Sequence, residues 1–147
     1  MTRAGSLKTV VTQRTPIGRV ITGKEWYYID RQGLKMPLSV NYSARVPLVS
    51  GQFTDEDIPV VFLLLKKINS EEFLTNSIVG IHKASNGDYL LKTRMYDQEI
   101  RIGTIAGLDT KLKKLLVFYK KIIQEKAVGD YKTINLKYNN QVVCTKY

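Results

Sequence analysis

The chain has 147 residues, of which 44% are apolar, and a formal net charge of +10. This composition supports one modest folded domain and excludes a collagen or a disordered tail. It also excludes a membrane bundle, because the longest apolar run, Val60–Leu65, is far shorter than the roughly 20 residues that cross a bilayer. Met1–Thr15 has no apolar stretch of the kind found in a secretory signal. The single cysteine, Cys144, and the single histidine, His82, exclude an internal disulfide and a Cys/His zinc cluster.

The charge is unevenly distributed along the chain. Residues 1–50 carry a net charge of +6, residues 51–100 of −3 and residues 101–147 of +7. An acidic middle between two basic ends argues against one continuous nucleic-acid-binding stripe and is typical of solvated surfaces. A polyanion or an anionic membrane surface beside the basic ends stays open as an alternative.

The N-terminal part of the sequence predicts short strands. Leu7–Arg14 alternates in the manner of a strand, which ends before Pro16 because proline lacks an amide donor. Trp26–Ile29 and Leu34–Met36 flank Asp30–Gly33. The Asp-first, Gly-last pattern of that segment predicts a tight turn between two strands.

Two prolines, Pro37 and Pro47, bracket an irregular passage that ends in Val46–Gly51. We expect this passage to form edges or connectors rather than central strands, because proline cannot donate to a sheet. A helix is predicted to start next, since the acids Asp55–Asp57 suit the positive end of a helix dipole and a proline follows in the first turn. It should run to about Asn69, and its apolar residues on all sides predict burial against a sheet. Ser70–Glu72 can start a further short helical turn.

The middle of the chain predicts three antiparallel strands in series. Ser77–Ala84 and Tyr89–Tyr96 flank Asn86-Gly87, a strong signal for a hairpin turn. Asp97-Gln98 forms a second predicted turn, which leads into Glu99–Gly103.

The clearest helical pattern begins at Leu108 and is predicted to end near Gly129, with apolar residues on one side and lysines mostly on the other. Two final strands, Tyr131–Tyr138 and Gln141–Tyr147, are predicted around the turn Asn139-Asn140. The order of elements predicts an α+β fold, a mostly antiparallel sheet with two main helices packed on one face and a C-terminal β-hairpin at the sheet edge.

The residues that could carry chemistry are isolated. His82 lies mid-strand without a surrounding motif, and we expect a surface or partly packed histidine. Cys144 alternates with Val142 and is expected to act as a small hydrophobic residue. Asp55–Asp57 could imitate a metal site, but the helix dipole explains these acids better. Without a nucleophile motif, a phosphate loop or a spaced cysteine pair, the sequence predicts no catalysis, no cofactor, no metal and no small-molecule substrate.

Nucleic-acid binding is the alternative that the basic charge and the nine tyrosines raise. Single-strand binders present several aromatic rings on one sheet face. Trp26, Tyr27 and Tyr28 are consecutive, so their side chains must alternate between faces and cannot form one platform.

A binding module is the remaining interpretation, and the C-terminal hairpin is its most informative feature. The strand Gln141–Tyr147 has no helix after it in this sequence, so one side of its backbone can stay open for a partner strand. Aromatic and positive side chains at Lys137, Tyr138, Lys146 and Tyr147 suit an acidic or mixed partner. The alternative is that the hairpin simply completes the core sheet, and the residues alone support either.

Six segments, taken in order, resemble the FtsQ/DivIB family of cell-division proteins. Because chance matches need not keep sequence order, the series is more specific than any one segment. The segments are Thr12–Val20, Tyr28–Gly33, Arg45–Gly51, Ile102-Gly103, the lysine-rich helix from Leu108, and Ile134–Asn140.

The resemblance implies that the chain is a fragment. Family members have a short cytoplasmic tail, one membrane helix, a POTRA domain and a C-terminal β domain outside the inner membrane. Residues 1–15 would then be vector-derived residues and the last strand of a truncated POTRA domain, and residues 16–147 the β domain. The resemblance implies a full-length protein anchored in the cell inner membrane by a single helix, with this domain on the periplasmic side and soluble as a fragment.

The resemblance also implies a non-enzymatic divisome scaffold that binds FtsB and FtsL and helps control septal peptidoglycan synthesis; the alternative is a basic nucleic-acid-binding domain. In the family, the last strands receive a segment of FtsB by strand pairing. Lys137 stands where the family has arginine, and it lacks arginine's planar two-point contact with a carboxylate. The partner-binding residues implied in this way are Lys137, Tyr138, Asn140, Gln141, Val142, Val143, Cys144, Thr145, Lys146 and Tyr147.

Overall fold

The computed structural model describes residues 15–23, 25–37, 46–52, 54–138 and 142–147. The predicted strand Leu7–Arg14 and the predicted turn Asn139-Asn140 therefore lie outside the described residues. In chain order the elements are β1 (Pro16–Ile21), β2 (Trp26–Asp30), β3 (Lys35–Pro37), β4 (Leu48–Gly51), α1 (Ile58–Asn69), α2 (Glu72–Ser77), β5 (Ile78–Lys83), β6 (Tyr89–Thr93), β7 (Glu99–Gly103), α3 (Leu108–Gln124), β8 (Tyr131–Asn135) and β9 (Val143–Lys146).

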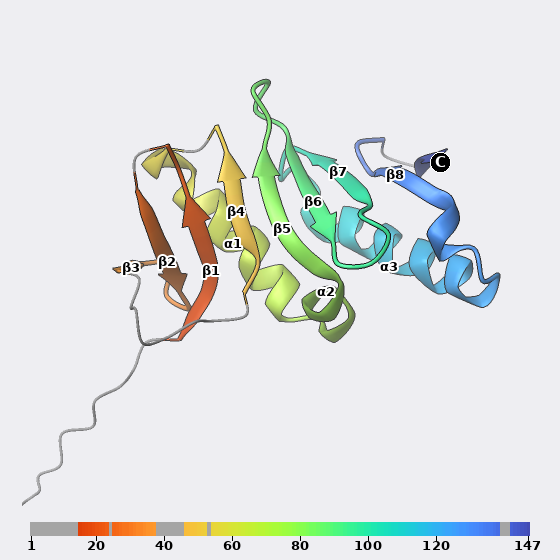
Figure 1. The fold of residues 1–147 in the computed structure, drawn as a ribbon, viewed down its shortest axis with the longest axis horizontal. Coiled ribbons are helices and arrows are strands. Elements are labelled where there is room, and N and C mark those ends of the chain that lie inside the picture. The colour runs from red at the N-terminus through yellow and green to blue at the C-terminus, as the bar shows by residue number, and fades with distance from the viewer. Residues whose placement is uncertain (1–14, 24, 38–45, 53, 139–141) are drawn as a thin grey trace, which may run out of the picture.

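The strands form one nine-stranded sheet in the order β3-β2-β1-β4-β5-β6-β7-β8-β9. Most neighbours are antiparallel, but β4 runs parallel to β1 and β5, and β8 runs parallel to β7. All three α-helices lie behind the sheet in the view of Figure 1, which leaves the other face towards the reader. The predicted α+β class, with helices on one face of a mostly antiparallel sheet and a C-terminal strand pair at its edge, is confirmed.

The prediction that the proline-bracketed passage forms only edges or connectors is wrong for β4. This strand lies in the middle of the sheet, where Val49 is opposite Ile81 of β5. Pro47 sits just before β4, where the sheet needs no donor from it, and its carbonyl accepts the amide of Arg19 at 3.0 Å. A proline at the residue just before a central strand therefore costs the sheet no hydrogen bond.

The first helix begins as its acids predicted. A 3-10 turn, Asp55–Asp57, precedes α1, and the Thr54 amide donates to the Asp57 carboxylate at 2.9 Å in a capping box. Only one side of α1 is fully buried, although the sequence is apolar all round. This side consists of Val61, Leu64, Leu65 and Ile68, which pack with the sheet into one core.

The helix α3 ends at Gln124, so its predicted end near Gly129 is wrong. Lys126 adopts the left-handed conformation with φ 56°, and its amide donates to the Ile123 carbonyl. The next amide, that of Ala127, donates to Ile122 at 2.8 Å, which completes the pattern that closes many helices. Glycine usually occupies the left-handed position, so a lysine there gave no sequence signal.

Within the described residues no helix is both long and apolar enough to span a membrane.

Candidate partner-binding edge

β9 is the last strand of the sheet. It pairs with β8 in an antiparallel register that places Thr145 opposite Thr133 and Cys144 opposite Ile134, and no other described strand pairs with it. The alternative that the hairpin simply completes the core applies to β8, whose Ile134 is fully buried, as is Leu136 just after it. β9 contributes only half-buried or exposed side chains.

The outer edge of β9 carries backbone groups that point away from β8. The Tyr147 amide donates to the Asp130 carbonyl at 3.2 Å, on the β8 side. Successive residues of an antiparallel strand direct their N–H and C=O groups to opposite sides. The groups of Cys144 and Lys146 therefore face the outer edge, whereas those of Val143 and Thr145 face β8.

Side-chain contacts also hold β9 in position. The Lys146 ammonium lies 5.5 Å from the centre of the Tyr131 ring, and the Tyr147 hydroxyl donates to the Tyr96 carbonyl at 2.5 Å. Cys144 is half-buried, and burial raises the pKa of its thiol, so it behaves as the small hydrophobic residue that the sequence suggested. Val143 is 41% exposed on the other face of the strand.

The predicted strands of the hairpin extend further than β8 and β9 do. β8 ends at Asn135, whose side-chain oxygen accepts the Lys137 amide at 2.9 Å. Leu136 then donates to the Arg101 carbonyl at 2.9 Å, which keeps the chain beside β7. Tyr138 thus lies beyond the strand, not within it. Asn140 and Gln141 lie outside the described residues.

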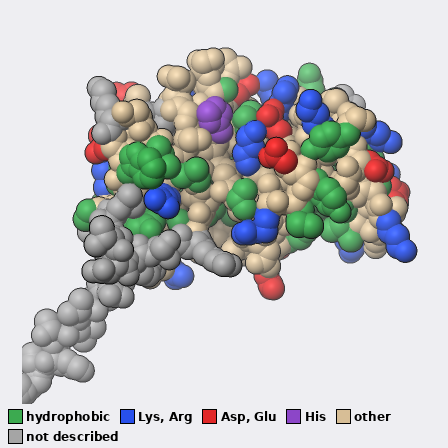
Figure 2. Space-filling view, in the orientation of Figure 1, with side chains coloured by type: hydrophobic (Ala, Val, Ile, Leu, Met, Phe, Trp, Pro, Cys, Tyr) green, Lys and Arg blue, Asp and Glu red, His purple; other side chains and the backbone are tan. Residues whose placement is uncertain are grey.

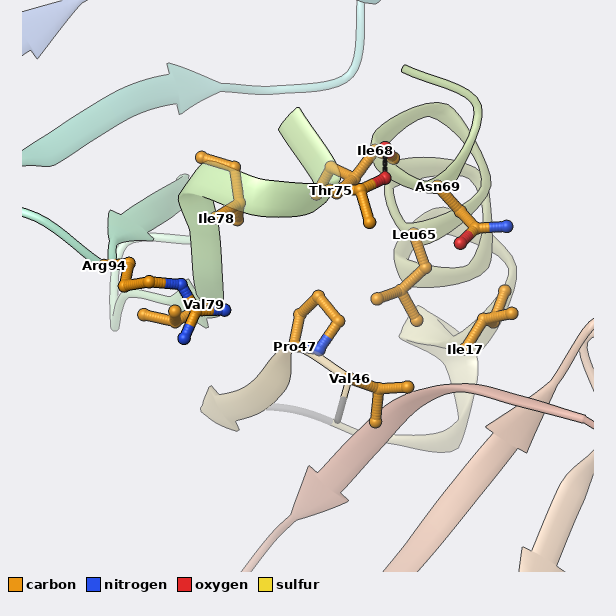
Figure 3. A pocket seen from close by; sticks show the side chains of 10 residues that line it. All are labelled: Ile17, Val46, Pro47, Leu65, Ile68, Asn69, Thr75, Ile78, Val79 and Arg94. Carbon is orange, nitrogen blue, oxygen red and sulfur yellow. Dashed lines mark hydrogen bonds between the residues drawn. The ribbon is translucent and has the colours of Figure 1, made fainter. Parts of the chain in front are cut away.

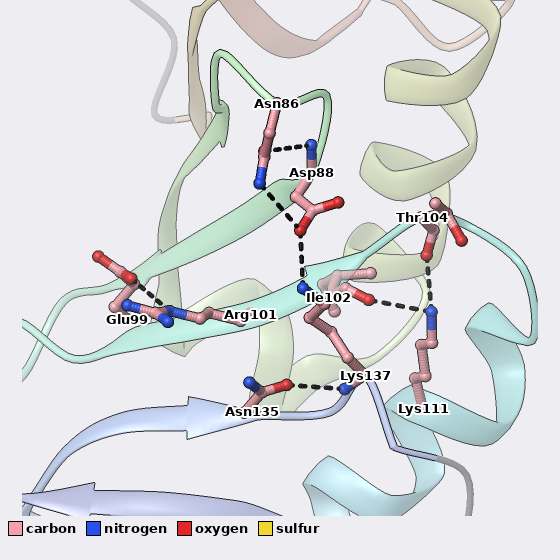
Figure 4. Close-up of polar contacts among 9 residues, drawn as sticks. All are labelled: Asn86, Asp88, Glu99, Arg101, Ile102, Thr104, Lys111, Asn135 and Lys137. Carbon is pink, nitrogen blue, oxygen red and sulfur yellow. Dashed lines mark hydrogen bonds and ion pairs between the residues drawn. The ribbon is translucent and has the colours of Figure 1, made fainter.

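The two predicted anchors before the turn differ in what they contact. The Lys137 ammonium forms an ion pair with Asp88 at 2.9 Å (Figure 4). The Lys137 side chain also crosses Gly103, where an added Cβ atom would lie 3.0 Å from the Lys137 Cγ. Lys137 therefore already has a carboxylate from its own chain. Tyr138 is 51% exposed, and its carbonyl accepts the ammonium of Lys114.

A buried glutamine that the sequence did not single out fixes the entry into β8. Gln98 is 1% exposed, and its amide nitrogen donates to the carbonyls of Val128 at 2.6 Å and Tyr131 at 3.0 Å. Its side-chain oxygen accepts the Tyr119 hydroxyl at 2.6 Å. Burial raises the pKa of Tyr119 well above its ordinary value, so this hydroxyl stays protonated and can donate. The sequence predicted only a turn here.

The candidate chemical groups elsewhere are engaged in local contacts. His82, purple on the open sheet face in Figure 2, lies with its Nδ1 3.1 Å from the Ser50 hydroxyl on the neighbouring strand. Asp55 and Asp57 form ion pairs with Lys35 and Lys83 respectively. No group of three His, Cys, Asp or Glu able to hold a metal occurs in the part of the chain that the structure describes.

The aromatic run does not form a nucleic-acid platform. Trp26 is 55% exposed, whereas Tyr27 and Tyr28 are buried. The Arg19 guanidinium lies over the Trp26 ring, 5.5 Å from its centre. Proteins that bind single strands stack the bases on several exposed rings. This run exposes one ring, which already has a cation of its own chain over it, so it gives little support to nucleic-acid binding.

A hollow of about 380 Å³ opens at the end of the sheet where β1, β4 and β5 begin (Figure 3). Two of its polar wall side chains make hydrogen bonds within the chain. The Thr75 hydroxyl donates to the Ile68 carbonyl at 2.8 Å, and the Arg94 Nε donates to the Asn76 carbonyl at 3.2 Å. The remaining wall is mostly aliphatic, so the hollow does not bring together complementary catalytic groups.

The comparison with protein families identifies the chain. The family model described as FtsQ/DivIB, C-terminal related, matches residues 15–145. The chain belongs to this family. The FtsQ/DivIB match begins one residue before β1 and ends within β9, so it includes nearly all of the sheet and most of the edge strand. A search of the curated proteins gave no match.

Membership in the FtsQ/DivIB family indicates a role in cell division. Its proteins are membrane-anchored division scaffolds, not enzymes, and they act through interactions with other division proteins. The resemblance read from the sequence is therefore confirmed at the level of the family.

Proposed function

We propose that this domain is a non-catalytic divisome scaffold that binds a partner by adding a strand to the outer edge of β9. The observation that supports this most directly is the position of β9 at the end of the sheet, with the N–H and C=O groups of Cys144 and Lys146 directed outwards. Such an edge is a template for another main chain.

The partners we propose are FtsB and FtsL, from the resemblance to the FtsQ/DivIB family, and the process is control of septal peptidoglycan synthesis. The full-length protein would then be anchored in the inner membrane by one helix and present this domain on the periplasmic side. The anchors beside the edge would be side chains of the predicted set, above all Tyr138 and Tyr147, which are 51% and 69% exposed.

Backbone pairing alone does not supply a stable complex. Two outward-facing residues offer two donors and two acceptors, and a hydrogen bond contributes about 0.5–1.5 kcal/mol net, so the ladder supplies about 2–6 kcal/mol. Micromolar binding requires about 8 kcal/mol. Contacts of exposed side chains such as Tyr138 and Val143 must supply the rest, which is why anchor residues matter to this mechanism.

Proline substitution tests the pairing. Cys144→Pro removes one outward N–H and places a ring at the open edge, but it leaves the hydrogen bonds to β8 intact. We expect at least a tenfold loss of affinity for the extracytoplasmic segment of FtsB, measured by isothermal titration calorimetry. Cys144→Ala, which keeps the amide, should bind like the unchanged protein.

A second proline variant provides the positional control. Thr145→Pro removes an N–H that faces β8, so it should lower the stability of the strand pair itself, detected as faster amide exchange in β8. Circular dichroism must show that Cys144→Pro is folded. If that folded variant still binds the FtsB segment with unchanged affinity, strand addition at β9 is the wrong mechanism.

A further inference from the structure

A groove lies between α3 and the start of β9. It has a volume of about 450 Å³, and its walls come from one stripe of α3 together with a residue just before β9. The stripe residues follow one another at steps of three, one, three, one and three positions, which places them on a single side of the helix. The lining residues are Thr110, Lys113, Lys114, Val117, Phe118, Lys121 and Val142.

The floor of the groove is apolar. Val117 is 70% exposed. Phe118 is half-buried and packs edge-on against Tyr131, with 5.3 Å between the ring centres. Val142 packs partly against the core from the other side. The contiguous apolar surface thus begins in the core and continues out to solvent.

The rim of the groove is basic. Lys113 and Lys121 are exposed, and neither forms an ion pair with a carboxylate of the described residues. Lys114 donates to the Tyr138 carbonyl and so joins α3 to the chain that leads to β9. Asp109, the acid of the first turn of α3, is paired with Lys67 at 2.8 Å, and this ion pair holds the pKa of Asp109 below its usual value.

The groove adjoins the outer edge of the sheet, because Val142, just before β9, lines it. The opposite flank of α3, with Leu116 and Ile123, lines a hollow shared with Phe73 of α2, towards the middle of the molecule. The flank that carries Val117 therefore faces away from the middle. A strand added to β9 would lie about 4.8 Å beyond it, and every second side chain of that strand would point towards the helix layer. Those side chains would enter the groove.

We infer that the groove selects the strand that pairs with β9, by taking an apolar side chain flanked by carboxylates on the helix-facing side of that strand. The apolar side chain covers Val117 and Phe118, and the carboxylates meet the ammonium groups of Lys113 and Lys121. Charge complementarity of this kind favours an acidic strand and disfavours a basic one. The inference rests on the proposed strand addition and names the chemistry of the partner that would use it.

Two synthetic ten-residue peptides test the inference. Both carry the same alternating valine and threonine residues on the open face, and their helix-facing positions read Glu-Leu-Glu in one and Lys-Leu-Lys in the other. Fluorescence anisotropy with the full chain should show the acidic peptide binding about tenfold more tightly, a preference that declines as salt is added.

Charge reversal at the rim should invert the preference. Lys113→Glu combined with Lys121→Glu should bind the basic peptide more tightly than the acidic one. The control pair, Lys66→Glu with Lys120→Glu, makes the same change of net charge at exposed positions outside the groove and should keep the original preference. Lys121 lies in the last turn of α3, where a positive charge stabilises the helix. A Lys113→Gln, Lys121→Gln variant, which should lose the preference without inverting it, therefore accompanies the reversal.

The outcomes separate this inference from the proposed function. If Cys144→Pro weakens both peptides but charge reversal leaves the preference unchanged, strand addition stands and selection by the groove is wrong. If charge reversal inverts the preference but Cys144→Pro has no effect on either peptide, the groove selects acidic segments and the strand addition is wrong. If neither peptide binds the unchanged protein, the inference is overturned.

Discussion

Replacing Gln98 with leucine should destabilise the region that carries the proposed partner-binding edge. Leucine is close to glutamine in volume, and slightly larger, but its side chain can make no hydrogen bond. The change leaves the Tyr119 hydroxyl and the carbonyls of Val128 and Tyr131 without the partner they have in the fold. Each buried polar group left unpaired costs about 1–3 kcal/mol. The three together predict a loss of about 3–9 kcal/mol, a large part of the 5–15 kcal/mol that typically stabilises a domain.

The measurement is the free energy of unfolding from urea denaturation, followed by circular dichroism. Tyr119→Phe removes only one of these bonds and should cost about 1–2 kcal/mol. In the double variant, Gln98→Leu with Tyr119→Phe, the unpaired hydroxyl no longer exists. The two losses should therefore sum to more than the double variant shows, by about 1 kcal/mol. Hydrogen exchange should report the strongest effect in β8, since Gln98 bonds the chain where this strand begins.

Two results would contradict this reasoning. A Gln98→Leu loss below about 1 kcal/mol would mean that water or local movement satisfies the freed groups. Strictly additive losses would mean that the hydrogen bond from Tyr119 to Gln98 carries no coupling energy.

The remaining predictions concern a glycine at the end of β4 and an ion pair. At Gly51, φ is +105° and a Cβ atom would lie 2.1 Å from the Lys83 carbonyl oxygen, so Gly51→Ala should cost at least about 3 kcal/mol by thermal unfolding. Gly87→Ala, with φ +92° but open space around it, should cost about 1–2 kcal/mol; equal losses would refute the clash. Burial raises the pKa of Asp57, but the hydrogen bonds from Lys83 and Thr54 outweigh it and hold that pKa below the ordinary value. Its contribution is therefore present above about pH 4 and lost as pH falls through the lowered pKa. Asp57→Asn should then lower the unfolding free energy at pH 7 by about 0.5–1 kcal/mol, with a difference from the unchanged protein that shrinks in acid; a difference that does not change with pH would exclude this ion pair as its source.

Local signals determined many elements from the sequence. Asn86-Gly87 predicted the turn between β5 and β6, and Gly87 has the positive φ that this turn demands. The acids at 55–57 predicted the start of α1, and the spacing of apolar residues predicted α3. Each of these signals depends on residues a few positions apart, whose interactions are the same whatever the rest of the chain does.

Other features depended on residues distant in sequence. The sequence around Pro47 predicted a connector. In the structure, the amide of Arg19, 28 positions earlier, donates to the Pro47 carbonyl, and β4 lies between two parallel neighbours. The end of α3 at a left-handed lysine also gave no signal in the sequence, because lysine has no intrinsic preference for that conformation.

The proposed partner-binding edge combines both kinds of information. The alternating C-terminal residues and the ordered family motifs indicated an edge strand. The family match supports the resemblance to FtsQ/DivIB proteins on which the second of these signals depends. Only the tertiary structure decided that the amides of Cys144 and Lys146 face outwards, that Lys137 binds Asp88, and that a lysine-rimmed groove of α3 adjoins the strand. Strand pairing and helix packing bring together groups far apart along the chain, and a periodic pattern records which face a residue takes but not which neighbour it meets.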